Sequence, residues 1–321
     1  MGQADGGFMK ILFITSNRLG DAVLSTGLLA WLAGQYPDAK FTIACGPYAA
    51  GLFRAAPRLE RLIILTKQPW KKHWLDLWRD CVGTRWDLVV DLRNSLVSRF
   101  LFAERRAYGG KHQGQHKVIE HASVLGVHPP PAPHIWIDHA AEAEAARIMP
   151  VDRPVLALGP AANWACKQWP IENFAALAKR LTESVGALPG VAVLVIADEK
   201  EREQILPLVQ SIPDRDRIEL LGRELATVAA CLKRATIFVG NDSGLMHLAA
   251  AVGTPTLGLF GPGLENIYGP WGSHCATIRT VESREELLTR LKRSGNPFLN
   301  LMRGLSVERV VEAIRKLMAL N

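Results

Sequence analysis

The stretch Ile237-Phe238-Val239-Gly240-Asn241-Asp242-Ser243-Gly244-Leu245-Met246-His247-Leu248-Ala249-Ala250-Ala251 decides the fold. Its first three residues are β-branched or aromatic, which is typical of a buried strand, and we expect Gly240 and Asn241 to end that strand. The small and apolar residues after Ser243 predict a helix. A second apolar run, Thr256–Phe260, follows at once. Strand, loop, helix and strand in this order predict the parallel crossover of an α/β sheet.

The turn inside this unit has the chemistry of a binding site. The first amides of a helix are unpaired and favour anions, and Gly244 would let a phosphate approach the backbone closely. Asp242 is negatively charged and would repel a phosphate, so we expect it to bind hydroxyl groups such as those of a sugar. His247 lies one turn further on. A structural alternative is equally compatible with the spacing: Asp242 caps the helix, and His247 is a core residue.

Two series of alternating strands and helices extend along the chain. The first begins with the strand Lys10–Thr15, and the second begins with the strand Val155–Gly159, after a proline-rich segment and an Ala/Glu-rich helix. We therefore predict two Rossmann-like domains, residues 1–150 and 151–321. A final amphipathic helix, Ser306–Leu320, belongs to the second domain or packs back on the first.

Composition narrows the possible partners. The chain has 321 residues, a net charge of +7 and a pI near 9.3, which indicate an anionic partner: nucleic acid, a phosphorylated glycan or an acidic membrane surface. Its five cysteines have no CxxC spacing and predict unpaired thiols. The glycine-rich N-terminus is not typical of a signal peptide. No apolar stretch approaches the roughly 20 residues that cross a bilayer.

Metal and redox cofactors are not expected. No GxGxxG follows the first strand, which disfavours a nicotinamide enzyme. The one Asp-x-Asp, at Asp214 and Asp216, lies in a turn that begins with a proline, and we interpret it as a loop.

Polar residues follow the predicted strands of the first half. Asp21, beside Gly20, ends the predicted loop Ser16–Asp21 after the first strand, and we expect a helix, Ala22–Gln35, to follow it. A capping and a catalytic aspartate are equally compatible with this position. Two basic clusters lie further along. The cluster at 67–74 combines lysines with Trp70 and Trp74, and is either a solvated loop or an edge that touches an anionic acceptor or lipid headgroups. The cluster at 105–117 includes Arg105, Arg106, Lys111, His116 and Lys117.

Two charged residues follow strands of the second half. Lys167 lies between a strand end and a helix, and is a point charge directed at whatever lies over the sheet, or simply an exposed lysine. Glu199 follows the next strand, where a carboxylate can accept ribose hydroxyls or interact with a helix dipole.

Three motifs together resemble the signatures of glycosyltransferase family 9, the lipopolysaccharide heptosyltransferases. They occur in the family's order, from about Lys10 to the C-terminus: Gly20-Asp21, Lys167-Gln168-Trp169-Pro170, and Asp242-Ser243-Gly244-Leu245-Met246-His247-Leu248 with Pro255 and Phe260-Gly261-Pro262. The resemblance implies the GT-B architecture, an α/β fold of two facing Rossmann-like domains with parallel sheets and a cleft between them. The first domain would bind the acceptor, and the second would bind a nucleotide sugar.

The resemblance also implies an activity: inverting, metal-independent transfer of a heptose or related sugar from a nucleotide diphosphate donor to a lipopolysaccharide-type glycan. Asp21 would be the general base, and Lys167 would stabilise the leaving diphosphate. The expected donor-binding residues are Asn163, Lys167, Glu199, Asp242, Ser243, Gly244 and His247. The expected acceptor-binding residues are Arg18, Arg93, Lys111 and His116, the last of which resembles a histidine of the family.

The implied partners are a nucleotide diphosphate sugar and an anionic glycolipid, with no nucleic acid and no cofactor. The implied location is cytoplasmic, at the inner face of the cytoplasmic membrane. One departure concerns Ala161-Ala162-Asn163, where heptosyltransferases of the first type carry threonines on the phosphate. This departure leaves the identity of the donor sugar undetermined. A nucleotide-sugar hydrolase or epimerase, and a noncatalytic binding protein of the same fold, are the alternatives.

Overall fold

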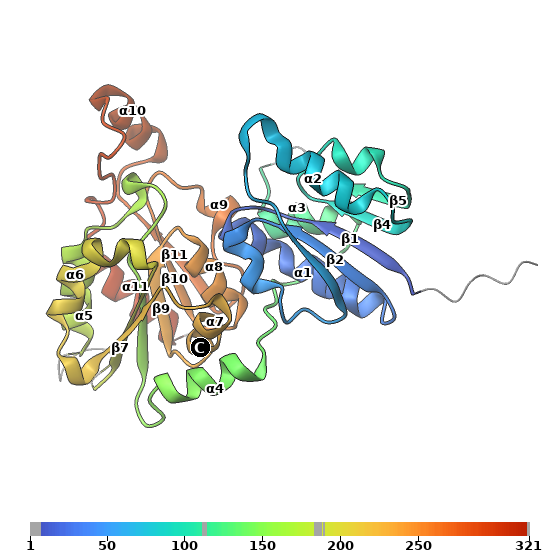
Figure 1. Cartoon of the computed structure of the whole chain (residues 1–321). Coiled ribbons are helices and arrows are strands. Elements are labelled where there is room, and N and C mark those ends of the chain that lie inside the picture. The colour runs from blue at the N-terminus through green and yellow to red at the C-terminus, as the bar shows by residue number, and fades with distance from the viewer. Residues whose placement is uncertain (1–7, 111–113, 183–187, 189, 320–321) are drawn as a thin grey trace, which may run out of the picture. The chain divides into compact units, whose positions relative to one another are not determined.

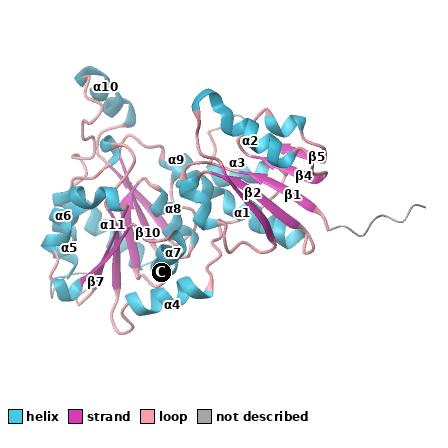
Figure 2. Cartoon of the chain, viewed as in Figure 1, coloured by secondary structure: helices cyan, strands magenta, loops and turns pink. Residues whose placement is uncertain are grey.

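The computed structural model describes residues 8–110, 114–182, 188 and 190–319, and strands alternate with helices along them (Figures 1 and 2). The chain divides into two compact units, Met1–Trp136 and Ile137–Asn321. Each unit contains one sheet, and within each sheet all strand pairs are parallel. The α/β class predicted from the sequence is confirmed.

The first unit has a five-stranded sheet in the order β3-β2-β1-β4-β5. Its strands are β1 (Lys10–Ile14), β2 (Lys40–Cys45), β3 (Leu59–Ile64), β4 (Trp86–Asp91) and β5 (Ala103–Tyr108). The register pairs Ile11 of β1 with Phe41 on one side and Leu88 on the other. The sequence did not reveal β5, because its arginines resemble a surface cluster and edge strands need no apolar run.

Helices cover both faces of this sheet (Figure 1). They are α1 (Leu19–Gln35), α2 (Lys72–Cys81) and α3 (Lys117–Ser123), with short 3₁₀ segments η1 (Pro47–Leu52), η2 (Pro69–Lys71) and η3 (Val97–Phe100). Because side chains alternate along β1, Leu12 and Ile14 face Leu77 of α2. Helix α1 begins three residues earlier than predicted, so that Asp21 lies in its first turn and not in a loop.

The second unit has a six-stranded sheet in the order β11-β10-β9-β6-β7-β8. Its strands are β6 (Val155–Gly159), β7 (Ala192–Ala197), β8 (Arg217–Leu221), β9 (Ile237–Asn241), β10 (Thr256–Phe260) and β11 (Cys275–Arg279). From β6 onward this is the 3-2-1-4-5-6 order of dinucleotide-binding folds. Strand β9 extends through Gly240 and Asn241, which the sequence had predicted to end it.

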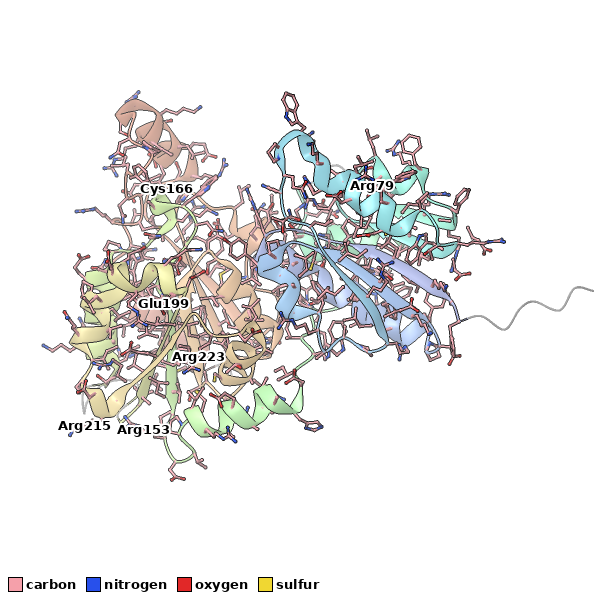
Figure 3. All side chains as sticks on the ribbon, in the orientation of Figure 1. Arg79, Arg153, Cys166, Glu199, Arg215 and Arg223 are labelled. Atoms are coloured by element: carbon pink, nitrogen blue, oxygen red, sulfur yellow. The ribbon has the colours of Figure 1, made fainter. Side chains whose placement is uncertain are left out.

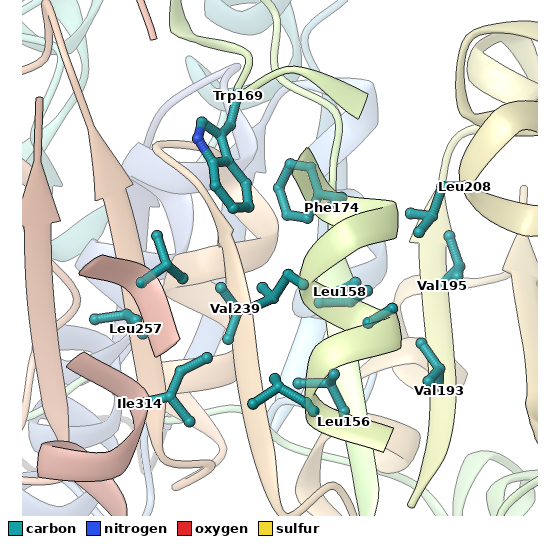
Figure 4. Packing of buried hydrophobic residues seen from close by; sticks show 14 of the residues in the cluster. Leu156, Leu158, Trp169, Phe174, Val193, Val195, Leu208, Val239, Leu257 and Ile314 are labelled. Atoms are coloured by element: carbon teal, nitrogen blue, oxygen red, sulfur yellow. The ribbon is translucent and has the colours of Figure 1, made fainter. Parts of the chain in front are cut away.

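One hydrophobic core of the second unit packs three of its eight described helices, the fifth, sixth and eleventh of the chain, against the sheet. The eight helices are α4 (His139–Ile148), α5 (Ile171–Thr182), α6 (Arg202–Ser211), α7 (Leu225–Lys233), α8 (Gly244–Ala251), α9 (Glu265–Tyr268), α10 (Arg284–Ser294) and α11 (Val307–Ala319). Trp169 and Phe174 meet edge to face at one end of this core, 5.0 Å between ring centroids (Figure 4). Helix α11 contributes Val310 and Ile314 to the same core, so it packs within the second unit.

Helix α4 also belongs to the second unit. It packs on α7, where Glu142 Oε2 lies 2.6 Å from Arg234 Nη1 and Glu142 Oε1 lies 3.1 Å from Lys233 Nζ. The contacts therefore divide the chain before α4, at Trp136, whereas the sequence placed the division after it, at residue 150.

The strand orders locate the place where ligands bind in such sheets. In each unit the first strand lies in the middle of the sheet, and later strands are added first on one side of it and then on the other. The order of winding therefore reverses between β1 and β4 in the first unit and between β6 and β9 in the second. Loops that follow these strands leave toward opposite faces, and ligands of open α/β sheets bind outside the strands' carboxyl ends at this point. The three family motifs follow β1, β6 and β9: the first lies in the first turn of α1, the second on the loop after β6, and the third begins on the loop after β9 and continues into α8.

All five cysteines are free thiols, as the sequence predicted. Burial raises the pKa of Cys45, Cys81 and Cys275 to about 12, so these thiols are protonated at neutral pH. In the part of the chain that the structure describes, no helix is long and apolar enough to cross a membrane.

Candidate active site

The loops after β6 and β9 bring Lys167 and Asp242 into an ion pair. Lys167 ends the 3₁₀ turn η4 (Ala165–Lys167), and its Nζ donates a 2.5 Å hydrogen bond to Asp242 Oδ2. The same ammonium lies 5.3 Å from the ring centroid of Trp164, which is exposed. The lysine side chain is 24% exposed and the aspartate side chain 9%. The ammonium is thus held by one carboxylate and one indole while it remains accessible to a ligand.

Asn241 fastens the two loops to each other. It is fully buried, its Nδ2 donates to the Pro160 carbonyl at 2.6 Å, and its Oδ1 accepts from the Trp169 amide at 3.0 Å. Trp169 Nε1 in turn donates to the Leu305 carbonyl at 2.8 Å. The loop that carries Lys167 is therefore fixed at both ends. Sequence reasoning missed Asn241, although a polar residue at the end of an apolar strand, directly before the motif, was the available signal.

The start of α8 has no side-chain cap. Ser243 is the N-cap residue, with φ −145° and ψ 172°, yet its side chain does not accept a helix amide. Its Oγ is buried and makes no hydrogen bond to another described residue. Asp242 bonds Lys167 instead of the helix, so the capping alternative for this aspartate is not what the structure shows. The first amides of α8 thus remain available to an anion, and the buried Ser243 hydroxyl beside them has no described hydrogen-bond partner.

Gly263 makes room for the carboxylate of Asp242. A Cβ atom at position 263 would lie 2.5 Å from Asp242 Oδ2, so a larger residue there would displace the ion pair. His247, one turn into α8, is 4% exposed, which is the burial expected of the core alternative.

Two further predicted donor residues, Glu199 and Asn163, lie on the same edge of the sheet, and the Lys167–Asp242 ion pair is formed without them. Glu199 follows β7, the neighbour of β6, and is exposed; its carboxylate makes two hydrogen bonds with Arg202, 2.6 and 2.9 Å long (Figure 3). These hydrogen bonds hold the pKa of Glu199 below its usual range. Asn163 is exposed on the loop after β6.

Helix α10 supports the lysine loop from outside the sheet. Cys166, which lies next to Lys167 and is labelled in Figure 3, packs with Leu287 of α10 and with Leu301. Asn300 Nδ2 donates to the Gln168 carbonyl at 2.9 Å. We did not predict α10, but its capping box of Ser283 and Glu286 was a readable signal of a helix start.

Asp21 lies at the carboxyl end of β1, in the first turn of α1, and is partly exposed. Its described hydrogen-bond partner is Ser16, whose Oγ lies 3.5 Å from Asp21 Oδ2. His121 of α3 contacts the Leu24 carbonyl through Nδ1, at 3.2 Å. Burial lowers the pKa of His121, and the nearby charge of Asp21 opposes that shift only in part, so the imidazole is neutral at neutral pH. Asp21 therefore has no cationic partner in His121.

Arg93 links the loops after β1 and β4. Its Nη1 donates to Asn17 Oδ1 at 3.0 Å, and its guanidinium lies 5.6 Å from the ring centroid of Trp74. Arg18, the N-cap residue of α1, is exposed. Asp91 is fully buried and accepts hydrogen bonds from the amides of Arg93 and Ser95, so it organises the loop.

The described residues of the second basic cluster have separate structural surroundings. Arg105 and Arg106 lie in β5, and the Arg106 guanidinium donates to backbone carbonyls, including that of Ala103 at 3.0 Å. His116 is the N-cap residue of α3, and its Nδ1 accepts from the Val118 amide at 3.2 Å, which is a structural role. Lys111 lies outside the described residues.

Within the described ranges, no group of three His, Cys, Asp or Glu side chains is arranged to hold a metal ion. Asp216 is engaged by Arg153, whose Nη2 donates to Asp216 Oδ1 at 2.7 Å, and Arg153 lies beside Arg215 (Figure 3).

Fold and site together define a class, the GT-B glycosyltransferases. Solved structures support the fold: a glycosyl transferase family 9 protein from Veillonella parvula DSM 2008 gives a TM-score of 0.81 with 20% identity and covers 100% of both chains. The ADP-heptose lps heptosyltransferase II of E. coli gives a TM-score of 0.76 with 20% identity, over 97% of this chain and 99% of that chain.

Sequence comparison gives the family. Residues 112–296 match glycosyltransferase family 9 (heptosyltransferase), and the chain belongs to that family. Lipooligosaccharide heptosyltransferase 2 of Haemophilus influenzae is 24% identical, over 97% of this chain and 100% of that protein. Lipopolysaccharide heptosyltransferase 1 of Pseudomonas aeruginosa is 26% identical, over 82% of each.

Proposed function

We propose that this chain is an inverting heptosyltransferase that transfers a heptose from ADP-heptose to a lipopolysaccharide core acceptor. The observation that carries the proposal is the Lys167–Asp242 ion pair beside the uncapped start of α8, at the winding reversal of the second sheet. The names of the relatives favour heptose and a lipopolysaccharide or lipooligosaccharide acceptor. An E. coli heptosyltransferase has been solved with ADP, which favours an adenine nucleotide.

The donor diphosphate would interact with Lys167 and with the first amides of α8. Ammonium and helix N-terminus both carry positive charge, and the charge on the diphosphate grows as the sugar leaves, so their interaction is stronger in the transition state. The buried Ser243 hydroxyl, which makes no hydrogen bond to another described residue, would donate to the same oxygens. It would compensate for Ala161 and Ala162, which have no hydroxyl to offer. Asp242 would accept from sugar hydroxyls and orient Lys167.

The reaction is a single displacement. The acceptor hydroxyl oxygen bonds to the anomeric carbon while the bond from that carbon to the diphosphate oxygen breaks, so the configuration inverts and ADP leaves. Asp21 accepts the proton of the attacking hydroxyl. A positioned base of this kind contributes roughly 10²–10⁴-fold to the rate. The partial exposure of Asp21 supports this role, because its carboxylate can be reached by an acceptor hydroxyl.

The first unit would bind the anionic glycolipid acceptor. Arg18 and Arg93 at the carboxyl end of its sheet, with Lys111, would contact acceptor phosphates or carboxylates. We assign His116 to capping of α3 before acceptor binding, because its Nδ1 already accepts a hydrogen bond from a backbone amide. The net charge of +7 supports a peripheral position at an anionic membrane surface.

Release of ADP from ADP-heptose, measured with and without a lipid A–Kdo acceptor, tests the proposal. We expect ADP release only when the acceptor is present. Equal release without acceptor would favour a nucleotide-sugar hydrolase. If ADP and ADP-heptose do not raise the unfolding midpoint, donor binding is absent and a noncatalytic scaffold is favoured.

A further inference from the structure

Exposed aromatic and aliphatic side chains gather on η2, α2 and η3 of the first unit and on the residues that flank η3. Residues 67–79 and 93–102 form what we call the α2–η3 surface. Its exposed apolar residues, with the exposed fraction of each, are Trp70 (92%), Leu75 (48%), Leu96 (70%), Phe100 (70%) and Phe102 (69%). Large apolar side chains this exposed, and this close in sequence, mark a surface that binds something.

The two segments form one continuous surface. Trp78 Nε1 donates to the Phe100 carbonyl at 3.4 Å, which joins α2 to the end of η3. Arg93 stacks on Trp74 of α2. Val97 and Leu101 anchor η3 in the core, so the exposure of its neighbours is not a sign of a detached loop.

The surface is strongly basic. It contains six Lys and Arg residues and a single acidic residue, Asp76. The basic residues, all exposed, are Lys67, Lys71, Lys72, Arg79, Arg93 and Arg99 (Figure 3 labels Arg79 on α2). Asp76 already accepts from Gln68 Nε2 at 3.0 Å and lies 3.6 Å from Arg79, so it does little to offset the positive charge.

The backbone at Trp70 is held in an unfavourable conformation. Trp70 and Lys71 have φ values of 57° and 58°, in the left-handed region that bulky side chains avoid. Packing does not explain this, since the Trp70 side chain is 92% exposed. Strain that holds an indole in solvent is consistent with a role in binding.

We propose that the α2–η3 surface docks the first unit on an anionic phospholipid bilayer. Aromatic side chains favour the headgroup region of a bilayer, and Lys and Arg beside them are attracted to lipid phosphates. A second copy of this chain is a poor occupant, because a two-fold contact would bring two sets of six positive charges together. The proposal fits a glycolipid acceptor, but it rests on the surface alone, and its test needs no enzymatic activity.

Vesicle co-sedimentation of the full chain tests the proposal, with phosphatidylcholine vesicles compared with vesicles that also contain phosphatidylglycerol. We expect binding only to the anionic vesicles, weakening as salt rises. Trp70→Ser/Phe100→Ser should weaken binding roughly tenfold or more, and Lys71→Gln/Lys72→Gln by a similar factor. The matched controls are Val281→Ser/Phe298→Ser, at two positions in the second unit that are 77% exposed, and Lys292→Gln/Arg293→Gln on α10. Both controls should bind like wild type.

A second measurement separates docking from general stickiness or misfolding. Brominated lipid in the anionic vesicles should quench tryptophan emission of the wild type, and Trp70→Phe should lose most of that quenching while it keeps the wild-type unfolding midpoint. Equal binding to neutral vesicles, wild-type binding by the Trp70→Ser/Phe100→Ser variant, or equal loss in the controls would overturn the proposal. So would a change in oligomeric state of that variant without a change in lipid binding, which would make the surface a self-interface.

Discussion

Lys167 Nζ and Asp242 Oδ2 lie 2.5 Å apart, although 75 residues separate them in the sequence. Sequence reasoning assigned them to different parts of the donor, the lysine to the diphosphate and the aspartate to hydroxyls. The ion pair couples those two roles. A diphosphate that arrives at the site must share the ammonium with Asp242, whose own charge repels it.

This coupling predicts non-additive effects on ADP binding. Lys167→Met should weaken ADP binding by roughly 1.5–3 kcal/mol, because a charged hydrogen bond is lost and the Asp242 carboxylate is left unpaired. Asp242→Asn should leave ADP affinity within a few-fold of wild type while it lowers the transfer rate. The double variant should bind ADP more tightly than Lys167→Met alone, since the unpaired carboxylate is gone.

Calorimetric titration of the wild type and the three variants with ADP closes this double-mutant cycle. If the two single effects simply add, the ion pair does not matter for the nucleotide. If Asp242→Asn loses ADP while Lys167→Met keeps it, the division of roles in the donor site is wrong.

A second prediction concerns the base. Asp21→Asn should reduce kcat by roughly 10²–10⁴-fold, because the amide cannot accept the acceptor's proton. ADP affinity should remain within a few-fold of wild type, since the donor residues all belong to the second unit. Single-turnover transfer, measured beside ADP titration, separates the two effects. A kcat close to wild type would remove Asp21 from the mechanism.

Much of the fold could be predicted from the sequence because buried parallel strands are apolar runs bounded by turn residues. Val155–Gly159 and Thr256–Phe260 were predicted with the bounds that the structure has. Strand β5 was missed because an edge strand can carry Glu104 and Arg105 on its exposed faces. Helix α10 was missed because it buries only Leu287 and therefore shows no apolar stripe.

The site was predictable in its chemistry but not in its contacts. Motif spacing placed Lys167 and Asp242 at strand ends, yet no local pattern shows that a side chain on one loop reaches another loop. Asn241 illustrates what could not be predicted. Its two side-chain hydrogen bonds, to Pro160 and Trp169, form because β6 and β9 are neighbours in the sheet. Strand order decides such contacts, and the sequence leaves strand order open.

Chelation tests whether the protein itself supplies the positive charge that stabilises the leaving group. Transfer should survive excess EDTA, because Lys167 and the α8 amides can stabilise the departing ADP without a metal ion. The activity of protein dialysed against EDTA should equal that of an untreated sample. Loss of activity that Mg²⁺ or Mn²⁺ restores would show that a metal takes part.

The packing of α4 on the second unit has a predictable pH dependence. Hydrogen bonds from Arg234 and Lys233 lower the pKa of Glu142. A lowered carboxyl pKa stabilises the folded state above the ordinary value of about 4.3, and this contribution is lost as pH falls through the folded value. Glu142→Gln should therefore lower the free energy of unfolding at neutral pH by about 1 kcal/mol, with the difference fading in acid.

Denaturant unfolding at a series of pH values checks this, with Glu144→Gln on the same helix as the control. Glu144 pairs within α4 with the exposed Arg147, so its loss should change stability little. A Glu142→Gln effect that is constant with pH, or equal to that of the control, would contradict the assignment.

The mass of the acceptor after reaction tests the central claim most directly. Lipid A–Kdo acceptor is incubated with ADP-heptose and the wild-type protein, and its mass is compared with that of acceptor incubated with the Asp21→Asn variant. We predict that the wild type adds one heptose residue to the acceptor and that the variant leaves the acceptor unchanged. An acceptor of unchanged mass in the presence of wild-type protein that binds ADP-heptose would contradict the assignment of heptosyl transfer to this chain.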